Sequence, residues 1–136
     1  FRSHILRLPD FSRPFVLQTD SSDTGLGSLL GQEYDGTLFP VAFASKKLLP
    51  RERAYSAIEK ECLALVWAVR KFEKYLYGQE FQLKTDHQPL AYINSAKYTN
   101  GRIMRWALFL QSYRFQIHAI KGKFNVGADY MSRVWN

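Results

Sequence analysis

Cysteine, long apolar runs and acidic side chains are all scarce in this chain of 136 residues. Its one cysteine, Cys62, excludes a disulfide framework and, within an apolar segment, is predicted to be a buried thiol. No apolar run approaches the roughly 20 residues of a transmembrane helix, and the first seven residues lack the apolar region of a signal peptide. We therefore expect a soluble, intracellular protein.

The shortage of acidic residues leaves a strongly basic chain. Lysine and arginine total 19 against 12 aspartates and glutamates, which gives a formal charge of +7. Such a surface favours a polyanionic partner such as nucleic acid. With 46% hydrophobic residues and no internal repeat, the chain is long enough for one domain with a substantial core.

The first half of the chain predicts a connector followed by an antiparallel meander. Residues 1–14 contain Pro9 and Pro14 and show no periodicity, so we place the domain at residues 15–136. Strands are expected at 15–20, 24–32 and 37–45, with the Asp35-Gly36 pair forming a hairpin turn. Pro40 cannot donate a ladder hydrogen bond, which favours an edge position for the third strand.

The second half predicts alternating helices and strands. A central helix over residues 54–77 ends at Gly78, and its crossover makes the strand at 81–85 parallel to the first strand. The remaining expected elements are helices at 89–93 and 102–112, a fifth strand at 115–120 and a closing helix at 125–133.

Four of the few carboxylates fall where they can meet. Asp20 and Asp86 each end a strand in Thr-Asp, and the carboxyl ends of parallel strands share one sheet edge. Glu61 lies on the sheet-facing stripe of the central helix, whereas Glu59 points about half a turn away and is expected to be a solvated partner of a basic residue. Asp129 opens the last helix. Such a cluster is tolerated mainly when divalent cations neutralise it, which indicates a two-metal phosphodiesterase.

Five motifs follow one another along the chain. They are FVLQTDSS at 15–22 with GLG at 25–27, AFASKKL at 42–48, YSAIEKE at 55–61, TDHQPL at 85–90 and NVGADYMSR at 125–133. In this order they resemble the ribonuclease H domain of gypsy-type long-terminal-repeat retrotransposon reverse transcriptases, and the resemblance runs from Leu8 to Arg133.

The resemblance implies an α/β ribonuclease H-like fold, with a five-stranded mixed sheet and helices on both faces. It implies endonucleolytic hydrolysis of the RNA strand of RNA/DNA hybrids during reverse transcription. Asp20, Glu61, Asp86 and Asp129 match the catalytic metal ligands of the family, for two Mg²⁺ ions that Mn²⁺ can replace. Residues 1–14 would lead from the polymerase part of a polyprotein, and the full-length enzyme can be a dimer, in the cytoplasm within a virus-like particle.

One family feature is missing. Many relatives carry a histidine in the loop before the last helix, but residues 121–124 contain none. We interpret His87, beside Asp86, as the better candidate for an auxiliary role and His118 as structural.

Substrate contacts are predicted in two places. Main-chain amides near Ser21, Ser22 and Gly25 are candidates for reading 2′-hydroxyl groups, although the glycines can equally just shape the strand. Among the basic clusters we favour Lys97, Arg102 and Arg105 for phosphate, with Tyr98 and Trp106 nearby, although Trp106 has the spacing of a core residue. The alternative clusters are 46–47 and 70–74, and each can be a solvated face.

Two other functions remain open. One is a hybrid-tethering or dimerisation domain that cuts poorly, which the intact carboxylates oppose. The other is a related fold such as an integrase or DNA junction nuclease, which cleavage of duplex DNA would reveal.

Overall fold

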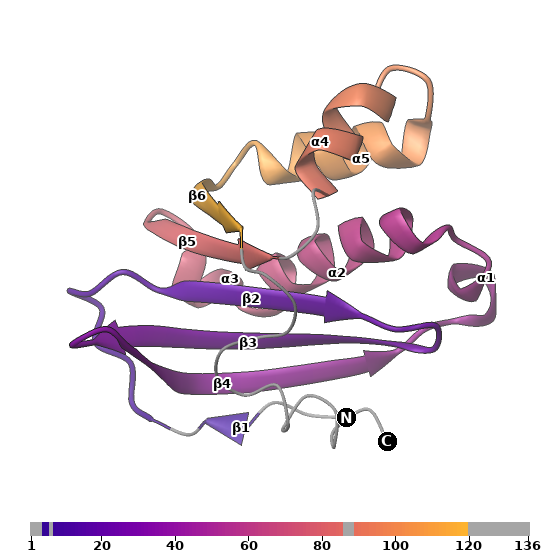
Figure 1. The fold of residues 1–136 in the computed structure, drawn as a ribbon. Coiled ribbons are helices and arrows are strands. Elements are labelled where there is room, and N and C mark those ends of the chain that lie inside the picture. The colour runs from indigo at the N-terminus through magenta and orange to yellow at the C-terminus, as the bar shows by residue number, and fades with distance from the viewer. Residues whose placement is uncertain (1–3, 6, 86–88, 120–136) are drawn as a thin grey trace.

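The fold is built on one mixed β-sheet, seen in a computed structural model that describes residues 4–5, 7–85 and 89–119. The sheet order is β1-β4-β3-β2-β5-β6 (Figure 1). The strands are β1 (His4–Ile5), β2 (Val16–Ser21), β3 (Gly25–Tyr34), β4 (Thr37–Lys47), β5 (Glu80–Thr85) and β6 (Arg114–Ala119). Strands β2, β3 and β4 are antiparallel neighbours, while β5 is parallel to both β2 and β6. The predicted five-stranded mixed sheet is confirmed, with β1 as a short addition.

The meander forms where its turn residues allow it. Asp35 and Gly36 join β3 to β4 with φ values of 53° and 80°, as a tight hairpin turn requires and as the sequence predicts. The pairing of β3 with β4 shifts register between Leu30 and Gly31. A Cβ atom on Gly31 would lie 2.8 Å from the carbonyl oxygen of Phe39, so this close approach of the two strands requires glycine.

The connector is more ordered than its sequence predicts. His4 and Ile5 pair with Phe43 and Ala42 of β4, so β4 is not an edge strand at those residues. The sequence misses β1 because two residues carry no periodicity. Pro40 lies outside this short ladder, which explains how it is tolerated there.

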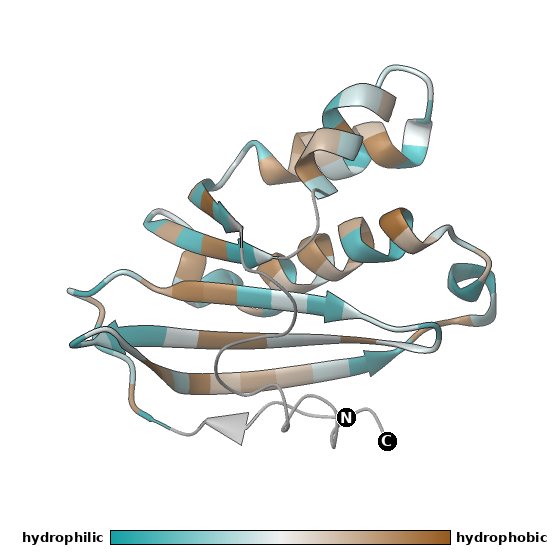
Figure 2. Cartoon of the chain, viewed as in Figure 1, coloured by the Kyte–Doolittle hydropathy of each residue, from teal (hydrophilic) through white to brown (hydrophobic). Residues whose placement is uncertain are grey.

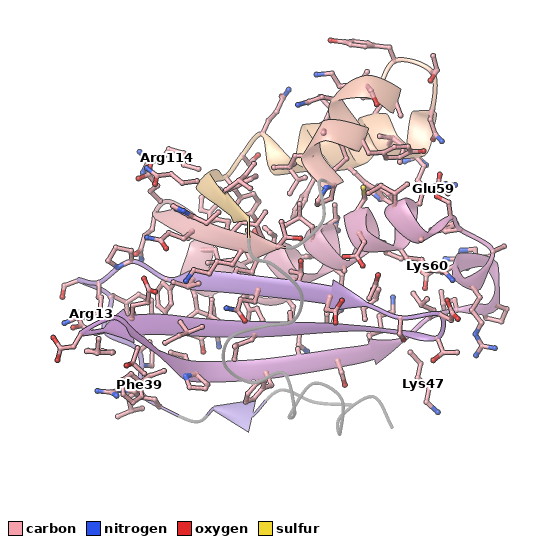
Figure 3. All side chains as sticks on the ribbon, in the orientation of Figure 1. Arg13, Phe39, Lys47, Glu59, Lys60 and Arg114 are labelled. Atoms are coloured by element: carbon pink, nitrogen blue, oxygen red, sulfur yellow. The ribbon has the colours of Figure 1, made fainter. Side chains whose placement is uncertain are left out.

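Gln32 of β3 ties the connector to the sheet. Its side chain is 1% exposed and makes three hydrogen bonds, accepting from the amide of Asp10 and donating to the carbonyls of Asp10 and Arg13. The Arg13 guanidinium also lies 3.9 Å from the centre of the Tyr34 ring. Residues 10–13 are therefore packed onto β3, at the end of the sheet where Figure 3 labels Arg13.

The predicted single helix over residues 54–77 is wrong in its extent, because two helices divide that range and a third precedes it. They are α1 (Pro50–Arg53), α2 (Ala57–Lys71) and α3 (Glu73–Leu76). Ser56 has an extended conformation and caps α2, its side chain accepting a hydrogen bond from the Glu59 amide. Phe72 leaves helical geometry and separates α2 from α3. Gly78, with φ of 80°, follows the end of α3, as expected of a helix C-terminus.

Helix α2 covers one face of the sheet, and α4 (Pro89–Ala96) and α5 (Gly101–Leu110) pack against α2 (Figure 1). Leu17 and Leu30 join the apolar side of α2 in the main core. Their strand neighbours Val16 and Leu29 belong to a separate buried cluster, as alternation along a strand requires. Hydrophobic residues on both faces make contiguous brown stretches along β2 and β4 in Figure 2.

Both faces of the sheet thus carry buried apolar residues, but a helix is described on only one of them. The predicted closing helix at 125–133 lies outside the described residues. No helix in the described part of the chain combines the length and apolar character needed to cross a bilayer.

Candidate active site

The carboxyl ends of β2 and β5 meet at one edge of the sheet. Their parallel register pairs Leu17 with Leu83 and Gln18 with Lys84. The register therefore carries the last residues of both strands, among them Asp20 and Thr85, to the same edge. Asp86 follows Thr85 in the sequence and lies outside the described residues, so its predicted place beside Asp20 stays a prediction.

Glu61 is buried against the end of β2. Helix α2 runs opposite to β2, so its first turns lie at the carboxyl end of that strand (Figure 1). The Glu61 side chain is 5% exposed, and its Oε1 atom accepts a 2.6 Å hydrogen bond from the hydroxyl of Ser21. The prediction that Glu61 faces the sheet is therefore confirmed.

Ser21 connects the two described carboxylates. Its hydroxyl bonds Glu61, and its amide donates a 2.9 Å hydrogen bond to Oδ1 of Asp20, which is half-buried. Sequence reasoning assigned Ser21 only to substrate. The signal for this linking role was the spacing of Ser21 from Leu17, because strand residues four apart share a face and Leu17 packs in the core with α2.

Of the four carboxylates predicted to bind metal, the structure describes Asp20 and Glu61. Both offer carboxylate oxygens, the ligands that Mg²⁺ prefers. The described residues contain no group of three or more His, Cys, Asp or Glu side chains placed to hold a metal. Asp129 and Asp86, the other two predicted ligands, lie outside those residues, as does His87.

The turn after β2 closes on itself. The Ser22 amide donates to the Gly25 carbonyl at 2.8 Å, and the Gly25 amide donates to the Ser22 hydroxyl at 3.0 Å. With the Ser21 amide bound to Asp20, all three amides predicted to read 2′-hydroxyl groups already donate within the protein. Reading by these amides would require those hydrogen bonds to open.

A cavity of about 280 Å³ lies between this turn and the start of α2. Its lining comes from Ser21, Ser22 and Asp23 on one side and from Ala57, Ile58, Lys60 and Glu61 on the other. The predicted substrate residues Ser21 and Ser22 therefore share a concave surface with Glu61.

Glu59 turns away from this cavity toward α5, as predicted from helix geometry. Its Oε2 accepts a 2.8 Å hydrogen bond from the Arg102 guanidinium. The prediction of a basic partner is correct, but the prediction of a solvated side chain is wrong, since only 14% of it is exposed. Burial alone would raise the pKa of Glu59, but hydrogen bonds from Ser56 and the charge of Arg102 outweigh burial and lower it.

Arg102 is consequently held by the protein itself. Besides its ion pair with Glu59, its guanidinium lies 4.1 Å from the centre of the Tyr55 ring. Sequence reasoning missed this pairing because the two charged residues are far apart in the chain. Its predicted contact with substrate phosphate would have to share the guanidinium with Glu59.

The other predicted phosphate contacts are more accessible. Arg105 is exposed, and Lys97 is half-buried with its ammonium 5.0 Å from the Tyr98 ring centre. Tyr98 itself is 77% exposed. Trp106 is half-buried and packs on the main core, in line with its helical spacing.

Comparison with known proteins identifies the family to which this chain is similar. Residues 10–113 match the model of the RNase H-like domain found in reverse transcriptase. The chain is 45% identical over 133 residues to the Retrovirus-related Pol polyprotein from transposon 297 of Drosophila melanogaster, covering 98% of this chain and 12% of that protein. It is 39% identical over 130 residues to the corresponding polyprotein from transposon gypsy of the same organism, covering 95% of this chain and 12% of the relative. The chain thus spans about an eighth of the length of these relatives.

Solved structures agree on the fold. The native prototype foamy virus protease-reverse transcriptase superposes with a TM-score of 0.71 at 19% identity, covering 85% of this chain and 16% of that one. A foamy viral protease-reverse transcriptase in complex with RNA/DNA hybrid gives 0.66 at 20% identity, covering 89% and 17%. This chain belongs to the family of RNase H-like domains found in reverse transcriptase, of the kind carried by gypsy-class transposons.

Proposed function

We propose that this chain hydrolyses the RNA strand of RNA/DNA hybrids in a Mg²⁺-dependent reaction during reverse transcription. The observation that carries the proposal is the buried Glu61 carboxylate, bonded to Ser21 directly beside Asp20 at the carboxyl end of β2. A buried carboxylate costs free energy unless it is compensated. The burial of Glu61 against the end of β2, next to Asp20, supports a site that binds cations.

The chain's own residues suit hard divalent ions. Asp20 and Glu61 supply oxygen ligands from two different elements, and Ser21 fixes Glu61 in orientation. We place Asp86 and Asp129 in the same ligand set. When bound, the ions would activate water and stabilise the leaving 3′ oxygen.

The substrate would lie across the edge where β2 and β5 end. Ser21, Ser22 and Gly25 border that edge, and Arg105 and Lys97 extend a basic surface over α4 and α5. One foamy viral neighbour was solved with an RNA/DNA hybrid, which supports the same class of substrate for this chain. We further propose that the polymerase part of the same polyprotein is a partner, that the full-length enzyme can dimerise, and that it works in the cytoplasm.

The test is incubation of the chain with an end-labelled RNA/DNA hybrid, with Mg²⁺ or with EDTA. We expect fragments of the RNA strand with Mg²⁺ only, and none from the Glu61→Gln variant. Asp35→Asn is the matched control, because it makes the same kind of change at an exposed hairpin turn whose positive φ asparagine tolerates.

Two results would contradict the proposal. Binding of the hybrid without cleavage would favour the tethering function. Cleavage of duplex DNA in preference to the hybrid would favour the integrase or junction-nuclease class.

A further inference from the structure

Lys60 is a buried lysine beside the candidate active site. It is 8% exposed, and its ammonium donates a 3.3 Å hydrogen bond to the main-chain carbonyl of Asp23. Burying an ammonium costs free energy unless acceptors compensate. Lys46 and Lys84 have carboxylate partners, Glu52 and Glu33, whereas the described partner of Lys60 is a neutral carbonyl.

The turn that Lys60 holds is the segment between β2 and β3. Within that turn, Ser22 bonds Gly25 through its amide and its hydroxyl. The turn is therefore closed by its own hydrogen bonds. Asp23 lies at its tip and offers the carbonyl that Lys60 reaches.

Helix α2 contacts this region at two consecutive residues with opposite chemistry. Lys60 donates to the turn at Asp23, and Glu61 accepts from the strand at Ser21. Both residues line the 280 Å³ cavity, and Figure 3 shows Lys60 on the side of α2 nearest the end of β2. Two contacts in opposite directions fix the turn against the helix more firmly than either alone.

We propose that Lys60 is a positioning residue that locks the β2–β3 turn to α2, so that Glu61 and the substrate-facing Ser21 and Ser22 keep a fixed separation. This inference rests on the proposed function for its consequence, which is correct placement of the RNA strand. A methionine of the same length would fill the space at lower desolvation cost. The charge is therefore explained by holding the turn and not by stabilising the core.

The test uses amide hydrogen exchange of the metal-free protein, which needs no substrate. In Lys60→Met, the Ser22 and Gly25 amides should exchange at least about tenfold faster, as expected when one hydrogen bond from a charged donor is lost. The melting temperature should change little. Arg53→Met, which removes an exposed positive charge from the neighbouring α1, should leave both amides unchanged.

A second variant covers the case in which Lys60→Met does not fold. Lys60→Arg keeps a cationic donor and should preserve most of the protection of Ser22 and Gly25. Unchanged exchange in folded Lys60→Met, or equal acceleration along the whole of α2, would overturn the positioning role, as would loss of protection in Lys60→Arg as large as in Lys60→Met.

Hydrolysis supplies the second readout. We expect KM for the hybrid to rise about tenfold in Lys60→Met with kcat within about threefold, and recovery in Lys60→Arg. An equal fall in kcat with unchanged KM would contradict positioning. If the wild-type chain cuts no hybrid at all, the proposed function fails, while the exchange experiment still decides whether Lys60 locks the turn.

Discussion

Glu59 and Glu61 lie on two sides of α2 and have different surroundings. On the side facing α5, Glu59 lies 2.8 Å from a fixed guanidinium, which also stacks on Tyr55. On the side facing β2, Glu61 accepts a hydrogen bond from the Ser21 hydroxyl at the end of that strand. A carboxylate that a protein neutralises with its own cation serves structure. Glu61 instead lies at the carboxyl end of β2, beside Asp20, where we propose that cations bind.

The largest effect expected along α2 concerns Cys62, which lies in its interior next to Glu61. Burial, and then the charges of Glu61 and Glu59, raise the pKa of the thiol to about 12 from 9.0. This rise in the pKa of Cys62 reduces the fraction of thiolate at neutral pH about 1,000-fold. Reaction with a thiol reagent should therefore be slower by at least that factor in the folded protein than in denaturant. A fast reaction in the folded protein would show that α2 moves enough to expose Cys62 to the reagent.

The rate of hydrolysis should distinguish the role of Glu61 from that of Glu59. Glu61→Gln should reduce cleavage of an RNA/DNA hybrid by at least about 100-fold if Glu61 binds metal as we propose, because losing a ligand costs no less than losing a residue that orients one. Glu59→Gln should reduce it only a few-fold, since glutamine can still accept hydrogen bonds from Ser56. Equal losses in single-turnover measurements would end the distinction between the two sides.

The substitution at Glu59 should affect the stability of the protein more than it affects cleavage. Glu59→Gln removes a largely buried charge that Arg102 faces, and we expect a loss of about 1 kcal/mol in the free energy of unfolding. In a double-mutant cycle with Arg102→Ala, most of this loss should appear as coupling. Denaturant titration measures each term, and independent effects of the two substitutions would remove the ion pair from the explanation.

The pH dependence of that loss has a defined sign. The pKa of Glu59 is lowered in the folded state from its ordinary 4.5, so its contribution is present above about pH 4.5 and is lost as pH falls through the lower folded value. The stability difference between wild type and Glu59→Gln should therefore shrink below pH 4.5 and be constant from there to neutral pH. A difference that grows on acidification would contradict the lowered pKa.

The smallest effect concerns the two arginines of α5. Arg105 is exposed and available to phosphate, so Arg105→Ala should reduce the salt dependence of hybrid binding by about one in log–log slope. Arg102→Ala should weaken binding mainly through the loss of stability, with a smaller change in slope. Matched slopes for the two variants would show that Arg102 also reaches the nucleic acid.

The sequence predicted those features that depend on local periodicity. The meander, the Asp35-Gly36 turn and the inward side of Glu61 follow from spacing and turn chemistry over a few residues. The break before α2 was also readable, because Ser56 and Glu59 form a capping box whose spacing is visible in the sequence. The prediction missed this break because the long apolar stretch after it favoured one continuous helix.

Contacts between distant segments were not predictable in this way. The pairing of Glu59 with Arg102 depends on how α5 docks on α2, and no spacing rule reports it. The internal hydrogen bonds of the Ser22 and Gly25 amides depend on the exact turn conformation. The pairing of the short strand β1 with β4 was likewise not predictable, because two residues have no periodic pattern of their own.

The attachment of the connector through Gln32 also has a mechanical consequence. A pull on the chain ahead of Asp10 would be carried into β3 by the three hydrogen bonds of Gln32 before it reached Phe15 and β2. Because the three bonds converge on one buried side chain, they share the load in parallel. Asp20 stands at the far end of β2 from this attachment, so we expect a pull on residues 7–9 to be taken up by β3 before it changes the spacing between Asp20 and Glu61.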